Sequence, residues 1–305
     1  MKSVSIIGVG RLGGALAIAL ARKKYNIENL FFKNKSKTDI SQFINSQPVK
    51  LFENEYSQIA SETIFITTRD SEIEKVADHL AKKLRCLPFI FHTSGSLSSK
   101  NLKVLKAIGC KVGSVHPLAS ISDAVSGAEH FAGAYFCVEG DPEAVLAAEK
   151  LVRDLGGKSF SIETKYKALY HASAVTACGH LVALIDVAIE MLTKCGLKEA
   201  HAQEILMPLV KSTIENLNTQ KPSEALTGTF ARADVETFEN HLQIMKKTVS
   251  KDVLEVYLQL GFRSLHLAGE QGADEKNIAK MQNKILLAKK ISSVKIKLNV
   301  NQEIT

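Results

Sequence analysis

The sequence contains no tryptophan, and aromatic residues make up only 6% of its 305 positions. Its five cysteines are odd in number, widely spaced and never in Cys-x-x-Cys order, so we expect reduced core thiols and no disulfide framework. A metal site at Cys178, His180 and Cys195 is conceivable. Those positions lie in a stretch with the pattern of a core helix, however, and we predict no metal.

Long apolar runs are missing as well. No run of about 18 residues is uncharged and apolar throughout, and only Lys2 precedes a strand-like segment at the N-terminus. We therefore expect neither a membrane span nor a signal peptide, and a cytoplasmic location. The net charge of +7 is spread over many lysines. This distribution does not indicate nucleic-acid binding; it suits either a phosphorylated anionic cofactor or an ordinary solvated surface.

Short apolar runs alternate with helical stretches through the first half of the chain. This alternation predicts an α/β fold with a doubly wound parallel sheet of the Rossmann type. The predicted strands are Val4–Gly8, Leu30–Lys33, Thr63–Thr67, Phe89–His92, Lys111–Val115 and Tyr135–Val138. The last of them is either antiparallel or a late addition to the sheet.

The pattern becomes helical after Gly156. We predict helices over Glu163–Lys194, Lys198–Asn218, Asp234–Val249, Lys251–Ala268 and Glu275–Ala288. The expected domains are a Rossmann-type domain (1–160), an all-α domain (161–290), and a tail (291–305) that is a strand or loose. Because the segment 170–189 is apolar nearly all round, we expect a homodimer through it.

A glycine motif carries the strongest functional signal. The letters GVGRLG, beginning at Gly8, follow a predicted strand and open a helix, which is the context of a dinucleotide-binding turn rather than of a chance glycine-rich turn. Gly8 permits the tight turn, Gly10 lets a pyrophosphate approach, and Gly13 lets the helix pack on the strand. Free N–H groups at the helix start, at Arg11 and Leu12, would face the phosphates.

No acidic residue follows the second predicted strand, where NAD enzymes offer one to the ribose hydroxyls. Asn34, Lys35 and Ser36 stand there instead and suit a 2′-phosphate. We therefore predict NADP, with NAD possible, since ordinary surface lysines would give the same sequence.

Polar residues gather where the predicted strands stop, at the edge of the sheet where α/β proteins bind ligands. Thr67 and Thr68 end the third run and are assigned to the cofactor. Ser94 follows the fourth run, and His116 precedes Pro117, which keeps it out of a helix. Turn formation accounts for part of this pattern.

Three candidate residues come from the helical half. Lys167 and His171 are four residues apart, so they share one helix face and could supply or orient a proton. Arg232 follows a break in the helical pattern. It could hold a carboxylate or phosphate, cap a neighbouring helix, or pair with Asp234.

With these residues in place, the chain resembles the family that joins a Rossmann-like oxidoreductase domain to a C-terminal helical domain of unknown function. The marks of the resemblance are GVGRLGGAL (8–16), HTSGSLS (92–98), SVHPLAS (114–120), KALYHASAV (167–175) and LTGTFARAD (226–234). The chain is more distantly similar to pyrroline-5-carboxylate reductase, prephenate dehydrogenase and the 6-phosphogluconate and β-hydroxyacid dehydrogenases.

The resemblance implies site roles for particular residues. Those relatives place a catalytic lysine at the start of a long helix with an asparagine four residues on; Lys167 fits the lysine, and His171 replaces the asparagine. The pair His116-Pro117 is similar to one in prephenate dehydrogenases. Where this family usually has Pro before Ile, the chain has Thr229-Phe230, so the backbone near Arg232 is expected to differ.

The predicted function is NADP-dependent hydride transfer between nicotinamide and a small C=O or C=N substrate, with an anionic group, in an interdomain cleft. Lys167 or His116 would donate the proton. Ser94 and His171 would orient the reacting group, and Arg232 would hold the anionic group. Two alternatives stay open: a non-catalytic NADP-binding sensor or partner-binding protein, and a deazaflavin-dependent reductase on the same fold.

Overall fold

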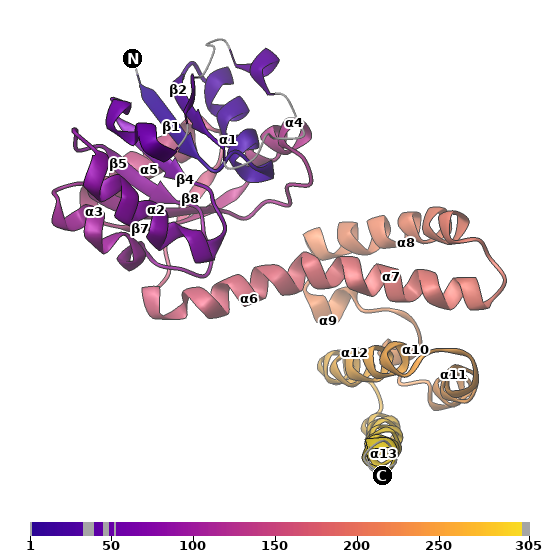
Figure 1. The fold of residues 1–305 in the computed structure, drawn as a ribbon. Helices are drawn as coiled ribbons and strands as arrows, with labels where there is room; N and C mark the ends of the chain where they lie inside the picture. The colour runs from indigo at the N-terminus through magenta and orange to yellow at the C-terminus, as the bar shows by residue number, and fades with distance from the viewer. Residues whose placement is uncertain (1, 33–39, 45–48, 52, 301–305) are drawn as a thin grey trace. The chain divides into compact units, whose positions relative to one another are not determined.

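The computed structural model of the chain describes residues 2–32, 40–44, 49–51 and 53–300 (Figure 1). The predicted NADP determinants Asn34, Lys35 and Ser36 lie outside these residues. The chain divides into two compact units, Met1–Gly179 and His180–Thr305. The division falls later than the boundary expected at residue 160, because the helix that begins at Lys167 makes its contacts with the sheet of the first unit.

The first unit is built on one eight-stranded sheet with the order β3-β2-β1-β4-β5-β6-β7-β8. The strands are β1 (Ser3–Ile7), β2 (Asn26–Phe31), β3 (Val49–Leu51), β4 (Thr63–Ile66), β5 (Phe89–His92), β6 (Lys111–Pro117), β7 (Tyr135–Gly140) and β8 (Lys158–Phe160). Every neighbouring pair is parallel except β6 and β7. The predicted doubly wound sheet with a late antiparallel strand is confirmed. The strands β3 and β8 were not predicted, because three residues are too few to show a pattern.

Helices cover both faces of this sheet. They are α1 (Arg11–Arg22), α2 (Asp70–Lys83), α3 (Lys103–Ala107), α4 (Ala124–Gly127) and α5 (Pro142–Asp154), with short 3-10 turns at Ser41–Phe43, Glu53–Gln58, Ser99–Leu102, Ala128–Phe131 and Thr164–Tyr166. Alternate strand residues face opposite layers: Phe65 packs with α1 and α5, whereas Ile64 and Ile66 pack with α2 and α3. The strand β4 therefore carries buried apolar side chains on both of its faces.

The predicted helix Glu163–Lys194 is interrupted. The structure has α6 (Lys167–Ala177) and α7 (Gly179–Lys194), separated at Cys178, where φ is −112° and ψ is −67°. Glycine after Cys178 weakens helix continuity, which apolar patterning alone does not reveal. The two compact units divide at the same point, after Gly179.

The second unit is entirely helical among its described residues. After α7 come α8 (Glu199–Thr219), α9 (Pro222–Ala225), α10 (Gly228–Ala231), α11 (Val235–Thr248), α12 (Lys251–Glu270) and α13 (Glu275–Val300). Phe238, Leu258 and Met281 are fully buried in the core that α11, α12 and α13 share. The predicted α8, α11 and α12 are confirmed. The last helix continues to Val300, well beyond the predicted end at Ala288.

The apolar residues of the segment Thr164–Lys194 are exposed or half-buried, and Val187 and Met191 pack partly against the core of the second unit. By length and composition this segment is the one helical stretch in the described part of the chain that could cross a membrane, with a mean hydropathy of 1.8 over an 18-residue window of which no share is buried. Val182 is 68% exposed. Cys178 and Cys195 are exposed too. The expectation of core thiols is thus wrong for these two and holds fully only for Cys110 and Cys137, because Cys86 is half-buried; every cysteine is free, as predicted.

Candidate functional site

The glycine motif forms the turn between β1 and α1. Gly8 has a φ of +100°, a conformation that other residues rarely adopt, and a side chain there would come within 2.8 Å of the Thr68 backbone nitrogen. A Cβ atom at Gly13 would lie 2.5 Å from the carbonyl oxygen of Gly8. A Cβ atom at Gly10 would meet no atom of the described residues within 4 Å. Gly8 and Gly13 are thus required by the fold, whereas Gly10 leaves open space beside the helix start.

The two threonines after β4 have different surroundings. The Thr67 hydroxyl donates to the carbonyl oxygen of Gly8 at 2.7 Å, so this side chain braces the turn. The Thr68 Oγ1 atom is buried and has no hydrogen-bond partner among the described residues. A buried hydroxyl without a partner costs free energy, which a bound ligand oxygen or nitrogen would recover.

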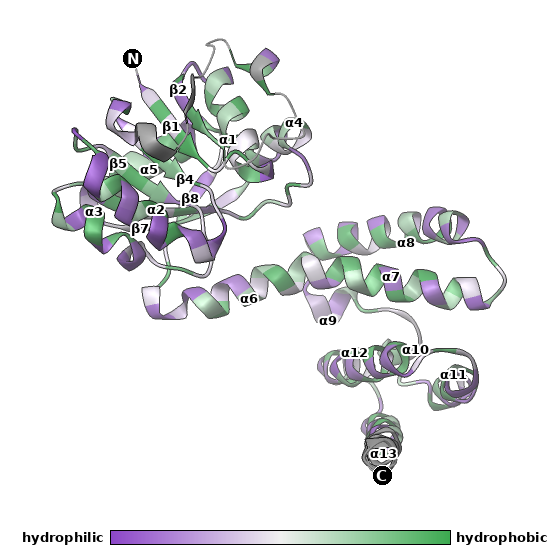
Figure 2. Cartoon of the chain, viewed as in Figure 1, coloured by the Kyte–Doolittle hydropathy of each residue, from purple (hydrophilic) through white to green (hydrophobic). Residues whose placement is uncertain are grey.

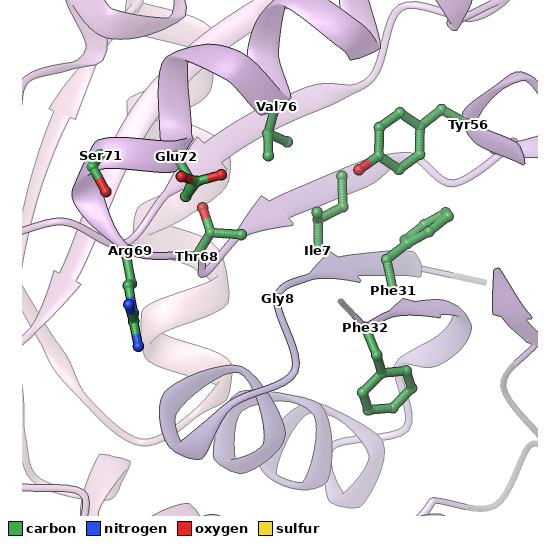
Figure 3. Close-up of a pocket in the computed structure, with 10 residues that line it drawn as sticks. All are labelled: Ile7, Gly8, Phe31, Phe32, Tyr56, Thr68, Arg69, Ser71, Glu72 and Val76. Atoms are coloured by element: carbon green, nitrogen blue, oxygen red, sulfur yellow. The ribbon is translucent and has the colours of Figure 1, made fainter. Parts of the chain in front are cut away.

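One pocket, of about 440 Å³, opens at the ends of β1, β2 and β4; we call it the aromatic pocket. Its lining residues are Ile7, Gly8, Phe31, Phe32, Tyr56, Thr68, Arg69, Ser71, Glu72 and Val76. Figure 3 shows the aromatic side chains on one side and the residues of the β4–α2 turn on the other, with Ile7 and Gly8 between them. An apolar wall facing a few polar groups is typical of a pocket for a planar organic group.

A second pocket, of about 300 Å³, lies at the ends of β4, β5 and β6; we call it the histidine pocket. It is lined by Leu12, Thr67, Thr68, Asp70, Thr93, Ser94, Gly95, His116, Pro117, Ala119, Ile121 and His171. Thr68 lines both pockets, and the glycine turn contributes Gly8 to one and Leu12 to the other. The two pockets therefore lie on either side of the glycine turn.

Two imidazoles meet over Gly95 in the histidine pocket. A Cβ atom on Gly95 would lie 2.5 Å from Nδ1 of His171 and 2.8 Å from Nε2 of His116. Nδ1 of His171 is buried without a hydrogen-bond partner in the described structure. Nδ1 of His116 is 2.7 Å from the hydroxyl of Tyr170. Both histidines thus offer one ring nitrogen to the same point.

Burial sets the charge of His116. Loss of water around the ring, followed by the nearby His171 and Lys167, lowers the pKa of His116 to about 4. The ring is therefore neutral at pH 7. Burial also raises the pKa of Tyr170 above its usual range, which keeps its hydroxyl protonated. The bond between them joins two neutral groups.

Ser94 belongs to a hydroxyl cluster around Asp70. The hydroxyls of Ser94 and Ser96 each donate to Oδ2 of Asp70 at 2.8 Å. Ser94 Oγ also accepts from the backbone N–H groups of Ser96 and Leu97. The Ser94 side chain is thus held at the floor of the pocket by bonds within its own loop and to α2.

Lys167 does not line the histidine pocket. The residue is 1% exposed. Its Nζ atom donates to Oγ of Ser114 at 2.7 Å and lies 3.5 Å from a carboxylate oxygen of Glu139. Ser99 donates to both oxygens of that carboxylate, from its backbone nitrogen and its hydroxyl. Burial lowers the pKa of Lys167, while Glu139 opposes the shift. The buried pair joins α6 to β6 and β7.

The structure therefore places the two residues of the predicted pair, Lys167 and His171, in different surroundings. Lys167 reaches into the sheet, whereas His171, one helical turn later, lines the pocket. Arg232 belongs to the second unit, where it is exposed just after the end of α10. The residue after it, Ala233, has a positive φ of 48°, and Asp234 caps α11 by accepting from the backbone of Thr237.

Several residues of the site were not predicted from the sequence. Tyr170 stands inside one of the family motifs, and Asp70 follows a predicted strand end; both positions were available as signals. Ser114 opens another of the family motifs, at 114–120, so the same kind of signal was available for it. Glu139 lies inside a strand and gave no signal, because a pattern of alternation cannot identify a buried ion pair. The aromatic wall of Phe32 and Tyr56 arises from segments distant in sequence.

Comparison with known families agrees with this architecture. Residues 1–117 match a Rossmann-like domain, and residues 134–264 match DUF2520, a domain of unknown function. The chain therefore combines a Rossmann-like domain with a DUF2520 domain. No curated protein matches the sequence.

Solved structures with this fold come from several organisms. A Bacteroides fragilis protein provisionally named as an NADP oxidoreductase is 20% identical with a TM-score of 0.71, over 87% of this chain and 98% of the other. A Thermotoga maritima protein is 23% identical with a TM-score of 0.67, over 88% and 99%. Plasmodium falciparum pyrroline carboxylate reductase with NADP bound is 17% identical with a TM-score of 0.57, over 88% and 98%. The structural kinship is thus with NAD(P)-dependent oxidoreductases, at the level of the fold.

Proposed function

We propose that this protein is an NADP-dependent oxidoreductase that passes a hydride between the nicotinamide and a small C=O or C=N substrate. The observation that carries the proposal is the pair of pockets that meet at Thr68 beside the glycine turn. A dinucleotide has two planar ends joined by a pyrophosphate. The aromatic pocket suits the adenine end, the open space at Gly10 suits the pyrophosphate, and the histidine pocket suits the nicotinamide end.

The unpartnered hydroxyl of Thr68 supports the same assignment. Its Oγ1 atom lies where the two pockets join, so a ribose or phosphate oxygen would satisfy it. Among the fold relatives, the reductase from Plasmodium falciparum is described with NADP bound. The preference for NADP over NAD rests on the residues 34–36 and is part of the proposal.

His116 and His171 take the chemical roles in this proposal. Bound nicotinamide supplies or accepts the hydride. His116 has a pKa of about 4, so at pH 7 it offers a hydrogen bond from a neutral ring rather than a proton. With Tyr170 donating to Nδ1, the N–H group at Nε2 faces the substrate oxygen or nitrogen. We assign the donation of the proton to His171, because its unpartnered Nδ1 atom approaches the same space over Gly95 as Nε2 of His116.

Lys167 then has a supporting role instead of the predicted catalytic one. Its amine is held by Ser114 and Glu139, so it fixes the start of α6 and with it Tyr170 and His171. Asp70 is the only aspartate, glutamate, lysine or arginine among the residues that line the described histidine pocket. An anionic substrate group would have to be met by other residues, and Arg232 remains our candidate for it.

The test is NADPH oxidation with a panel of imines and keto acids, and NADP reduction with hydroxyacids. We expect turnover with at least one compound. His171→Gln should lower kcat by about 10²-fold to 10⁴-fold, the usual contribution of a positioned acid or base. Full turnover in both His116→Gln and His171→Gln would refute the roles assigned to the two histidines. Tight NADPH binding without turnover would favour a sensor, and turnover with a deazaflavin alone would favour that cofactor.

We also propose a homodimer in which a second copy covers α7. This helix is apolar in composition, and none of its residues is buried within the chain. An apolar surface of this kind usually marks a protein interface.

A further inference from the structure

We propose that Arg69 binds the 2′-phosphate of NADP at the rim of the aromatic pocket. This inference rests on the proposed function and assigns a phosphate-binding residue on the β4–α2 turn, away from the segment after β2 that the sequence pattern favours. Arg69 lines the pocket together with Thr68 and Ser71 (Figure 3). Its guanidinium group can bind two phosphate oxygens at once, with a geometry that a lysine does not provide.

The guanidinium group of Arg69 has no hydrogen bond or ion pair with any described residue. Acidic neighbours are close in sequence, yet they are engaged elsewhere. The carboxylate of Asp70 accepts from Ser94 and Ser96, and Glu72 pairs with Lys75 at 3.5 Å. The folded chain thus leaves the positive charge of Arg69 available while it occupies the two adjacent carboxylates.

The surroundings of Arg69 point to a ligand on the adenosine side. Thr68, the preceding residue, holds a buried hydroxyl without a partner in the described structure. Phe31, Phe32 and Tyr56 form an apolar wall across the same pocket. A ligand that fills this pocket therefore needs a planar apolar part, a hydrogen-bonding group and an anionic group. Adenosine 2′-phosphate has all three.

Glu72 also lines the pocket, and its charge opposes an anion there. A pocket with a carboxylate and no cation would favour the free ribose hydroxyls of NAD. Arg69 reverses that preference, because a guanidinium group attracts a dianionic phosphate and gains little from a neutral hydroxyl. Arg69 should therefore contribute to the choice between NADP and NAD, beside the residues 34–36.

The experiment is calorimetric titration of the full-length protein with NADPH, NADH and adenosine 2′,5′-bisphosphate. Wild type, Arg69→Gln and Arg85→Gln are compared; Arg85 is exposed just after α2 and lines neither pocket. We expect Arg69→Gln to weaken NADPH and the bisphosphate by about 10-fold to 100-fold, and NADH by less than about 3-fold. Arg85→Gln should change none of them.

Equal weakening of NADPH and NADH would overturn the assignment, since the lost contact would then be to the pyrophosphate. Unchanged binding of all three ligands in Arg69→Gln would overturn it as well. Failure of the wild-type protein to bind either dinucleotide would refute the proposed function itself. An unchanged melting temperature for Arg69→Gln would show that a loss of affinity comes from the lost contact and not from unfolding.

Discussion

Individual side chains in the first unit differ sharply in how their polar atoms are satisfied. Lys167 and Glu139 are both buried and hold each other with the help of Ser114 and Ser99. His171 and Thr68 each keep an atom without a partner beside the pockets, within the part of the chain that the structure describes. Satisfied polar groups fix the frame, whereas Thr68 and His171 lie where a ligand would be expected. A third such atom, Nε2 of His92, is fully buried in β5 and lines neither pocket.

The buried pair of Lys167 and Glu139 gives a prediction about stability. Lys167→Met leaves a carboxylate that is 9% exposed without its cation. We expect the free energy of unfolding to fall by about 3 kcal/mol, because removal of one partner strands a buried charge. Urea unfolding followed by circular dichroism would measure it. The variant that carries both Lys167→Met and Glu139→Gln should lose less unfolding free energy than the two single variants lose in sum. If the two losses simply added, Lys167 and Glu139 would not be coupled.

The low pKa of His116 gives a prediction about pH. A free histidine has a pKa of about 6.5, whereas that of folded His116 is about 4. Between these values the unfolded chain binds a proton that the folded chain does not. Stability should therefore be full above pH 6.5 and fall as the pH is lowered towards 4. His116→Gln should show a shallower fall in unfolding free energy over this window, and His92, with a pKa of about 4, should account for part of the remainder.

At the scale of elements, the glycines in the turn between β1 and α1 differ in role: some are required by the fold, and one is available for binding. Gly13 allows α1 to lie against the carbonyl oxygen of Gly8, and Thr67 closes the turn from β4. Gly10 has no such neighbour among the described residues. Its open space has no packing role in the chain alone.

Substitutions at two glycines should separate these roles. Gly10→Ala meets no described atom within 4 Å and has a φ of −90°, so the melting temperature should stay within about 2 °C of wild type. NADPH affinity should drop by at least about 10-fold, since the methyl group occupies the path of the pyrophosphate. Gly13→Ala should lose both stability and binding. Unimpaired NADPH binding in Gly10→Ala would show that the dinucleotide does not bind at this turn.

For the whole molecule, burial is uneven along the chain. The sheet and the core around Phe238 are closed, while α7 buries none of its residues. In Figure 2 much of α7 is coloured as hydrophobic. A second copy of the chain is the occupant that we propose for this surface.

The dimer can be tested with a charge on α7. Val182 is 68% exposed, and Val182→Glu should convert a dimer into a monomer in light scattering at micromolar concentration, because a carboxylate would be buried without a partner. Leu146→Glu is the matched control, since Leu146 is 67% exposed on α5. Leu146→Glu should leave the mass unchanged. A wild-type monomer would refute the dimer.

Local patterns were enough to predict the sheet, most helices and the glycine turn from the amino-acid sequence. These features depend on residues that are near one another in the chain: apolar runs in β1 and β4, and glycines where the backbone needs them. Local patterns did not predict the break at Cys178, because the apolar pattern continues across it. They did not predict the strands β3 and β8 either, because these strands are too short to show alternation.

The roles of the candidate side chains, by contrast, depend on tertiary packing. Lys167 and His171 form one pair in the sequence, and the fold sends one into the sheet and the other into a pocket. Arg69 is one charge among acids in the sequence, and the fold engages those acids elsewhere. The partners of a buried or charged group come from strands and helices far apart in the chain. Their chemistry is therefore set by packing, which no local pattern records.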